Sequence, residues 1–424
     1  MGIGEVFAIA GQSNAQGGGE ETGLSWIHAV DDRVNSVDFN NSPAADNKLA
    51  IGFSKIDKDS SDIGPFHFVP WCWARLGDLL ADSLNVPVLF YGAAHGGTAV
   101  IHWRDASQGI ITPSILPDHW LKMYLGAPYK ALGVTLKYYA SLTGLRGILW
   151  HQGESDHETN PNDYQSRLEA VIADSREDIE CDTLAWMVAK VSYAKGTSAN
   201  PVNGQQQTID ADANVFNGPN TDELEGYTNR YDLIHLNTAA GLASHASYWF
   251  NSMVNNGLSF FENASAIPAR DFIDLDFTCT SNTPSNPITL STNSSYEKFA
   301  WSNRDNDAEE AKGFSLGRTL VNTVPAGYQK YNWQYDSTNS ITVGLGRYAL
   351  NVTKATSGVV LFSPVMDLNG LTLPTMPSFL SSASQIRHGD TLTLTGSNCN
   401  GLYKWSNGGT TNQLELYPSA TASY

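Results

Sequence analysis

The sequence predicts an α/β fold, in which a three-layer α/β/α domain is followed by a β-rich C-terminal region. In residues 1–256, short apolar runs typical of buried strands alternate with longer segments whose apolar residues recur at helical spacing. From about residue 267 the helical pattern stops, and short alternating runs are separated by Gly, Pro, Asn and Ser. Strand–helix alternation implies a parallel sheet that helices cover on both faces.

The apolar runs also place individual elements along the first region. Strands are expected at residues 6–10, 86–92, 147–150 and 183–191. Helices are expected at residues 71–84, 131–142, 164–179 and 238–254. In parallel sheets, reactive groups gather in the loops beyond the carboxyl ends of the strands. A functional site is therefore expected in the loops that follow these strands.

The C-terminal region contains an internal repeat. The segment ITLSTNSSYEKFAWSN at residues 288–303 matches LTLTGSNCNGLYKWSN at residues 392–407, with apolar positions in register. The pattern resembles the Ig-like β-sandwich modules that occur in tandem on secreted bacterial enzymes and adhesins; the alternative is chance similarity between polar β-rich segments. The second module is expected to be truncated, because it lacks the strands that would cover its edges. The expected domains are residues 1–262, 263–373 and 374–424.

Composition excludes some partners. The 424 residues carry 25 basic and 43 acidic side chains, a formal net charge of −18. Such a charge repels phosphate backbones and anionic lipid surfaces, so neither nucleic acid nor membrane insertion is expected. No run approaches the roughly 18 consecutive apolar residues that a membrane span needs.

Localisation and cysteine chemistry are less constrained. The N-terminus has no basic leader segment and runs straight into a strand, so no signal peptide is expected in this chain. The second half is rich in Asn, Ser and Thr and poor in Lys, which is typical of secreted or cell-surface bacterial proteins. The four cysteines lie far apart without a CxxC pair, so free thiols are expected, although their pairing cannot be deduced. They are Cys72, Cys181, Cys279 and Cys399.

Four motifs carry polar groups suited to catalysis. They are GQSN (11–14), AAHGGT (93–98), HQGESD (151–156) and DLIH (232–235), and the first three each follow an expected strand. In order and content they resemble those of the SGNH (GDSL-like) hydrolases over about residues 5–256. The most similar branch contains carbohydrate esterases such as acetylxylan esterases and sialate O-acetylesterase-like proteins. The resemblance implies an SGNH-type parallel sheet and esterase activity.

Ser13, His235 and Asp232 form the expected catalytic set. A serine hydroxyl becomes an effective nucleophile when a base removes its proton during attack, and His235 can serve as that base. An Asp three residues before a His can reach the imidazole and fix its tautomer. The alternatives are structural, since Ser13 and Asp232 are both residue types that favour helix N-caps.

An oxyanion hole is expected beside Ser13. The backbone N–H of Ser13, on a tight turn at the start of a helix, would face the developing negative charge. The resemblance implies two further donors, the backbone N–H of Gly96, with Gly97 as the alternative, and the side-chain amide of Gln152.

Three more residues in or near the motifs have expected roles that remain open. Glu154 is an alternative to Asp232 as the carboxylate that orients His235, or has a structural role. His151 and Trp103 are candidates for substrate binding, because imidazole and aromatic side chains can contact a sugar, and packing is the alternative for each. No metal-ligand spacing and no nucleotide-binding motif is present, so neither a metal nor a cofactor is expected.

These features predict a serine esterase that removes O-acetyl groups from a carbohydrate through an acyl-enzyme on Ser13. The acetylated-carbohydrate substrate follows from the family resemblance, with xylan first, ahead of pectin, sialate and bacterial polysaccharide. Two other classes remain as alternatives. One is a lipid esterase or thioesterase of the SGNH type, and the other is a carbohydrate-binding or adhesive protein with an inert esterase domain.

Overall fold

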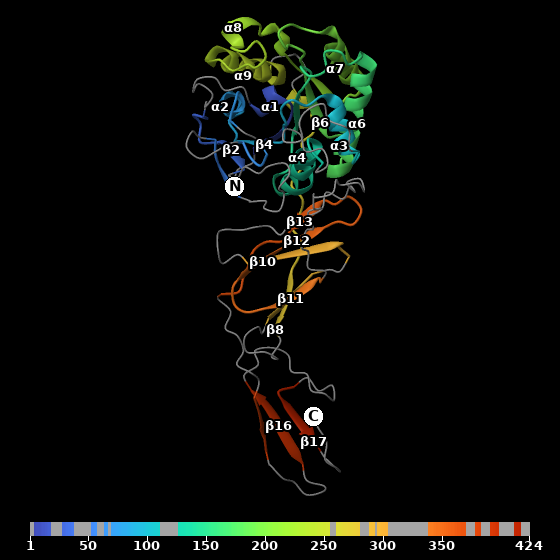
Figure 1. Ribbon diagram of the computed structural model, residues 1–424. Helices are drawn as coiled ribbons and strands as arrows, with labels where there is room; N and C mark the ends of the chain where they lie inside the picture. Colours follow the sequence, from blue (N-terminus) through green and yellow to red (C-terminus); the bar gives the residue numbers. More distant parts are fainter. Residues whose placement is uncertain are drawn as a thin grey trace, which may run out of the picture.

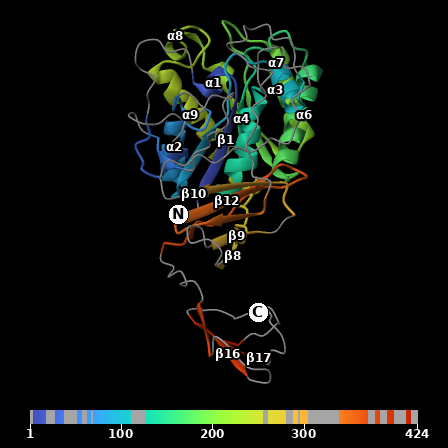
Figure 2. The same cartoon turned by 60° about the horizontal axis from the view of Figure 1, so that its bottom comes forward.

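A computed structural model provides the coordinates (Figure 1). It describes residues 4–17, 28–37, 52–56, 63–66, 69–110, 126–254, 260–279, 288–292, 295–303, 338–369, 378–382, 391–397 and 411–416. The N-terminal part combines helices with one large sheet, and the C-terminal part consists of antiparallel sheets (Figures 1 and 2). The predicted fold class, an α/β domain followed by a β-rich region, is therefore confirmed. The three domain boundaries stay a prediction.

The large sheet has seven strands in the order β3-β2-β4-β1-β5-β6-β7. All neighbouring strands are parallel except β2 and β3, which are antiparallel. The four predicted strands became β1, β4, β5 and β6, at the centre of the sheet and toward one edge. The strands are β1 (Glu5–Gly11), β2 (Val34–Val37), β3 (Phe53–Lys55), β4 (Val88–Gly92), β5 (Gly147–His151), β6 (Ala185–Lys190) and β7 (Val215–Asn220).

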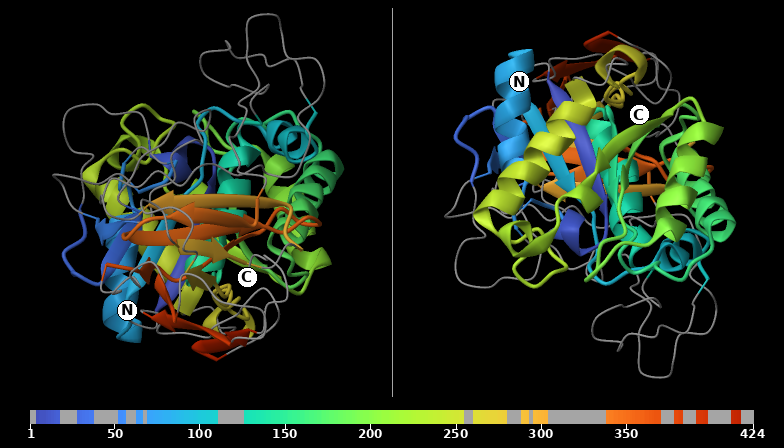
Figure 3. Two further views of the ribbon diagram at one scale, coloured as in Figure 1. Left: turned by 90° about the horizontal axis from the view of Figure 1, so that it is seen from below. Right: turned by 90° about the horizontal axis from the view of Figure 1, so that it is seen from above.

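Helices cover both faces of this sheet, as the view from above shows (Figure 3). Along β1 the side chains alternate, with Phe7 and Ile9 in one apolar core and Ala8 and Ala10 in the other. Helices α2 and α9 pack on the first face, and α3, α4, α6 and α7 lie on the second. The helices are α1 (Ser13–Gln16), α2 (Trp73–Leu84), α3 (Val100–Ser107), α4 (Tyr129–Val134), η2 (Thr135–Tyr139), α5 (Ala140–Thr143), α6 (Pro161–Ile179), α7 (Ala199–Ala211), η3 (Thr221–Glu223), α8 (Gly226–Asn229), α9 (Ala239–Val254) and α10 (Phe260–Asn263).

The helix predicted at residues 131–142 is interrupted by the π-helical turn η2. A π-helical turn takes more residues per turn than an α-helix and so changes the direction of neighbouring side chains. Here both adjacent tyrosines are fully buried, Tyr139 against Tyr91 of β4 and Tyr138 against Phe362. Burial of two consecutive rings explains the departure from a regular helix.

The described residues of the C-terminal part form three antiparallel sheets. Two of them, β10-β12-β13 with β14 and β11-β9-β8, face each other across one apolar core that includes Leu290, Trp301 and Leu350. The third is β15-β16-β17. The strands are β8 (Asp276–Cys279), β9 (Ile288–Ser291), β10 (Lys298–Asn303), β11 (Ser340–Val343), β12 (Arg347–Thr353), β13 (Val360–Phe362), β14 (Met366–Asp367), β15 (Ser378–Ser381), β16 (Leu392–Ser397) and β17 (Gln413–Leu416).

The repeated segments take equivalent positions in two of these sheets. Strand β9 is central between β8 and β11, and its counterpart β16 is central between β15 and β17. The rest of the second copy, residues 398–407, lies outside the described residues, as do Cys399 and the side chain of Cys279. Cys72 and Cys181 are free thiols, as expected for these two. The Ig-like resemblance stays a prediction.

The first β-rich unit packs directly on the α/β part. Val360 and Phe362 of β13 belong to the same apolar core as helices α4 and α6, and the Phe362 ring lies 4.8 Å from that of Tyr138. At the rim of this contact, Glu180 accepts hydrogen bonds of 2.6 and 2.7 Å from Lys354. Among the described helices, none is both long and apolar enough to cross a membrane.

Replacing Phe362 by Ala is expected to destabilise the α/β part as well as the β unit. Phe362 is 5% exposed, and deleting a buried Phe side chain costs about 3–5 kcal/mol. Thermal unfolding followed by circular dichroism should show a lower Tm. The matched control is Phe272→Ala, because Phe272 is 59% exposed and its loss should leave the Tm almost unchanged. Equal Tm values for the two variants would contradict the shared core.

Candidate active site

Ser13 lies where β1 ends and α1 begins. The chain turns at Gly11, which has a positive φ of 129°, and a Cβ atom there would lie 2.1 Å from the carbonyl oxygen of His151. Only glycine lets β1 end so close to β5 while turning in this direction. The turn leaves the Ser13 side chain half-buried at the carboxyl edge of the sheet.

The structure brings Ser13, His235 and Asp232 together in one hydrogen-bonded chain. The Nε2 atom of His235 lies 2.9 Å from the Ser13 Oγ, and its Nδ1 lies 2.6 Å from the Oδ2 of Asp232. An ionised carboxylate can only accept hydrogen bonds, so Asp232 selects the tautomer with a proton on Nδ1. Nε2 is then free to accept the proton of the serine hydroxyl.

Asp232 is held in place by the backbone of its own loop. Its Oδ1 accepts hydrogen bonds from the N–H groups of Ile234 and His235, at 2.9 and 2.7 Å. Partial burial raises the pKa of Asp232, but the hydrogen bonds from the side chain and backbone of His235 and from the backbone of Ile234 outweigh it, so the pKa lies below its usual value. The carboxyl group is therefore a carboxylate at neutral pH.

Gly96 faces Ser13 from the loop after β4. A Cβ atom built on Gly96 would lie 3.6 Å from the Cβ of Ser13. The backbone N–H of Gly96 donates a hydrogen bond of 2.6 Å to the side-chain oxygen of Gln16, the last residue of α1. Gly97 is exposed beside it. A carbonyl oxygen thus already occupies the position that a hydrogen-bond acceptor bound to Gly96 would take.

Gln152 does not fit the predicted oxyanion role. It is fully buried, and its side-chain nitrogen donates to the side-chain oxygens of Gln12 and Asp156 and to the carbonyl oxygen of Thr98. Its side-chain oxygen accepts from the Tyr164 hydroxyl at 2.9 Å. Since both amide hydrogens have acceptors in the protein, none remains for a substrate oxygen. Gln152 instead connects the first three motif loops.

Glu154 does not contact His235 by a hydrogen bond in the described structure. Its Oε1 accepts a hydrogen bond of 2.8 Å from the Asn14 side chain. The same Asn14 amide donates to the carbonyl oxygen of Ile234 and accepts from the N–H of Leu236. Burial raises the pKa of Glu154, against the lowering effect of the Asn14 hydrogen bond and the nearby Arg230 charge. Glu154 therefore acts on the histidine loop through Asn14.

His151 and Trp103 are fully buried, so the prediction that they contact substrate is wrong. The Nε2 of His151 lies 3.0 Å from the Thr221 hydroxyl, and its ring is 4.8 Å from that of His245. The indole N–H of Trp103 donates to the Thr98 hydroxyl. Both side chains pack beneath the motif loops. Their positions in the sequence, at the end of β5 and on α3, did not show that both rings point into the core.

Three residues that support the site had no role in the sequence analysis. Gln12 and Asn14 flank Ser13 and attach its loop to the other motifs. Arg230 is fully buried and donates hydrogen bonds to the carbonyl oxygens of Leu224, Thr221 and Ile234, which fixes the loop that carries Asp232 and His235. Gln12 and Asn14 belong to the GQSN motif and could have been considered from the sequence. Arg230 lies two residues before DLIH, and nothing in the sequence indicates that its side chain is buried against that loop.

A hydroxyl, an imidazole and a carboxylate linked in this way, at the carboxyl edge of a parallel α/β sheet, define a hydrolase-type site. Residues 3–248 match the sequence profile of a family described as carbohydrate esterase, sialic acid-specific acetylesterase. The chain belongs to this family, and it is a carbohydrate O-acetylesterase. Family membership implies an acetylated carbohydrate as substrate.

Two solved structures are among those similar to this chain. One is a carbohydrate acetylesterase from Xanthomonas citri, with 13% sequence identity, a TM-score of 0.43, and coverage of 85% of this chain and 78% of the other. The second is a protein from Arabidopsis thaliana, with 14% identity, a TM-score of 0.36, and coverage of 60% and 99%. No curated protein matches the chain in sequence.

Acid is expected to destabilise the protein through two histidines below the site. Burial, aided by the charge of Arg230, lowers the pKa of His151 to about 3 from 6.5, and burial also lowers the pKa of His245. Below pH 6.5 the unfolded chain therefore binds more protons than the folded one. The contribution of His151 to the free energy of unfolding is complete above that pH and decreases toward pH 3, by up to about 1.4 kcal/mol per pH unit. The contribution of His245 has the same sign and is also lost in acid.

The measurement is urea unfolding of wild type and His151→Gln between about pH 7 and about pH 4.5. The variant starts with a lower stability but should lose less of it as the pH falls. The control is His28→Gln, at an exposed position, which should show the same change of unfolding free energy with pH as wild type. If the unfolding free energy of the His151 variant changed with pH as much as that of wild type, burial of a neutral imidazole would be contradicted.

Proposed function

We propose that this acetylesterase works through an acyl-enzyme on Ser13, with His235 as the base and Asp232 as its orienting carboxylate. The observation that carries the proposal is the distance of 2.9 Å between the Ser13 Oγ and the His235 Nε2, with Asp232 at 2.6 Å on the other ring nitrogen. The three side chains are partly exposed, so a substrate can reach them from solvent.

In the first half of the reaction, the Ser13 Oγ bonds to the acetyl carbon while its proton moves to the His235 Nε2. The imidazolium that forms is stabilised by the Asp232 carboxylate. The bond between the acetyl carbon and the sugar oxygen then breaks, and His235 returns the proton to that oxygen. The sugar leaves as an alcohol, and the acetyl group remains on Ser13.

The second half repeats these steps with water. His235 takes a proton from a water molecule, whose oxygen attacks the acetyl carbon of the acyl-enzyme. The bond to the Ser13 Oγ breaks, and Oγ regains a proton from His235. Acetic acid is released and ionises in solution, and the enzyme returns to its starting state.

Two backbone N–H groups are proposed as oxyanion donors, those of Ser13 and Gly96. Among the described residues, none accepts a hydrogen bond from the Ser13 N–H, so this group can donate to the negative oxygen of the tetrahedral intermediate. The Gly96 N–H becomes available when substrate displaces the Gln16 oxygen. Donors of this kind contribute about 3–4 kcal/mol each to lowering the barrier.

We propose an acetylated plant polysaccharide, xylan first, as substrate, and a secreted or cell-surface bacterial location. A polymer outside the cell suits an enzyme whose C-terminal region carries repeated β-rich units, here proposed as Ig-like modules at residues 263–373 and 374–424. The acidic surface, with a formal net charge of −18, is compatible with a neutral polymer.

Ser13→Ala should abolish acetate release from acetylated xylan and from p-nitrophenyl acetate. Loss of the nucleophile removes the covalent step, so kcat should fall by at least about 10⁴-fold. The Tm should stay close to that of wild type, as for substitutions at the surface. The control is Ser247→Ala, an exposed serine on α9, which should behave as wild type. Full activity in the Ser13 variant would overturn the mechanism.

The same assay distinguishes a lipid-type esterase. That alternative expects medium-chain p-nitrophenyl esters to be turned over as well as the acetate. An acetylesterase should instead lose turnover steeply as the acyl chain grows.

Asp232→Asn is expected to lower kcat far more than Glu154→Gln. The asparagine keeps the shape but presents the wrong partner to the imidazole Nδ1, an exchange that costs about 10⁴-fold in a serine protease. The glutamine in the Glu154→Gln variant keeps an oxygen that accepts from Asn14, so its effect on kcat should stay within about tenfold. The reverse order of the two losses would make Glu154 the orienting carboxylate.

A further inference from the structure

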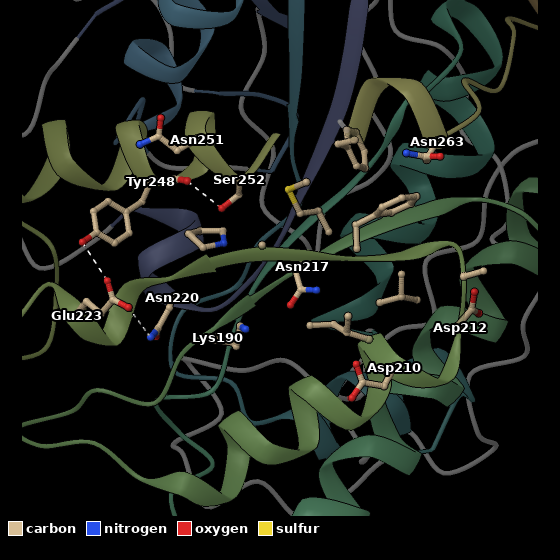
Figure 4. Close-up of a pocket in the computed structure, with 18 residues that line it drawn as sticks. Lys190, Asp210, Asp212, Asn217, Asn220, Glu223, Tyr248, Asn251, Ser252 and Asn263 are labelled. Atoms are coloured by element: carbon tan, nitrogen blue, oxygen red, sulfur yellow. Dashed lines mark hydrogen bonds between the residues drawn. The ribbon is translucent and has the colours of Figure 1, made fainter. Parts of the chain in front are cut away.

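A groove of about 940 Å³ runs along the outer side of β7, away from Ser13. β7 is the last strand in the sheet order, and among the described strands it pairs only with β6. Helices α7 and α9 flank the groove, as Figure 4 shows. Six residues of strand extend about 20 Å, so a ligand that fills the groove must be elongated.

The lining suits a sugar chain. Its polar walls carry four carboxamides, those of Asn217, Asn220, Asn251 and Asn263 (Figure 4). A carboxamide both donates and accepts hydrogen bonds, as a sugar hydroxyl does. Apolar floor residues, including Phe216, offer a surface for the C–H face of a sugar ring.

One end of the groove is pre-organised. Glu223 accepts a hydrogen bond of 3.2 Å from the Tyr248 hydroxyl and one of 3.0 Å from the Asn220 side chain. These bonds hold the Tyr248 ring at the rim, where Figure 4 shows it beside Glu223. A ring fixed before binding loses little conformational entropy when a ligand packs on it.

The charge of the lining selects against anions. Three carboxylates line the groove, those of Asp210, Asp212 and Glu223, against one ammonium group, Lys190. Asp212 is neutralised by Arg176, but the remaining balance is still negative. A phosphate or uronate group would be repelled here, whereas a neutral chain would not.

The groove begins at the same edge of the sheet as the catalytic loop. Asn220 ends β7 at its carboxyl end, and the next residue, Thr221, contacts His151 at the end of β5. Three strand spacings separate β1 from β7, which corresponds to about 14 Å. A chain several sugars long could therefore reach from Ser13 to the groove.

We propose that this groove is a second binding site for the substrate polymer, and that it takes a neutral polysaccharide chain rather than an acidic one. The proposal rests on the carbohydrate specificity given under the proposed function. It deepens that function, because it makes the natural substrate a long neutral polymer.

The test uses the full chain and measures binding without turnover. Affinity electrophoresis in gels that contain xylan, a neutral polymer, or polygalacturonate, an anionic one, should show retardation of wild type by xylan only. The double variant Asn217→Ala/Tyr248→Ala should bind xylan about tenfold more weakly, since it loses a hydrogen-bonding group and a ring contact. Retardation by polygalacturonate to the same extent as by xylan would overturn the proposal.

Kinetics supply a second readout. The double variant should raise the KM for acetylated xylan about tenfold and leave turnover of p-nitrophenyl acetate unchanged, which also shows that it is folded. Asn162→Ala, which removes an exposed carboxamide from α6, is the matched control and should bind and react as wild type. Should the double variant be unstable, Asn217→Ala alone, at an exposed position, gives the same comparison.

Failure of this proposal is distinguishable from failure of the proposed function. If the groove variants bind and hydrolyse acetylated xylan as wild type does, the groove is not a polymer site, while the Ser13 mechanism stands. If Ser13→Ala still releases acetate, the mechanism fails, whatever the groove binds.

Discussion

The two amide side chains on either side of Ser13 determine the geometry of the site. Asn14 bonds to the backbone on both sides of His235 and to Glu154, so the histidine loop is attached to the residue next to Ser13. Gln12 accepts hydrogen bonds from the third motif loop at Gly153 and Ser155. Residues far apart in the sequence thus meet at a single short turn. In its proposed role as nucleophile, Ser13 would need little rearrangement to react, because hydrogen bonds fix both of its neighbours.

This arrangement also explains why charged groups are tolerated below the site. Glu154 and Arg230 are buried; one carboxylate oxygen of Glu154 accepts from the Asn14 amide, and Arg230 donates to the carbonyl oxygens of Leu224, Thr221 and Ile234. Buried charges are costly unless they are hydrogen-bonded, and here their bonds hold the loops of Asp232 and His235. The polar layer beneath Ser13, His235 and Asp232 therefore supports the loops that carry these side chains.

Much of the fold could be predicted because the central strands are short apolar runs. Segments such as VFAIA and GILW are buried on both faces, which gives a clear pattern. Helix α7 and strand β7 could not be predicted. α7 contains Pro201 and Gly204, and a Cβ on Gly204 would lie 2.7 Å from Tyr164 of α6, so close packing selects glycine against helix propensity. β7 contains Pro219, which an edge strand tolerates.

The proximity of Ser13, Asp232 and His235 could be predicted, because the expected chemistry constrains residue type and order. The site was not predicted where the role depends on orientation. Gln152, His151 and Trp103 lie in or beside the expected loops, but their side chains turn into the protein. A sequence shows which residues follow a strand, whereas burial depends on packing between elements that are distant along the chain.

The Gln16 oxygen bound to Gly96 has a consequence for how catalytic power is divided. On the proposed mechanism, an arriving ester exchanges one neutral carbonyl for another at this N–H, so the exchange adds almost nothing to the affinity of the enzyme for intact substrate. The charged oxygen of the tetrahedral intermediate accepts a stronger hydrogen bond than either. Because the Gln16 oxygen already occupies the Gly96 N–H, this donor contributes little to the binding of intact substrate. Its stronger hydrogen bond to the tetrahedral intermediate lowers the barrier and so raises kcat.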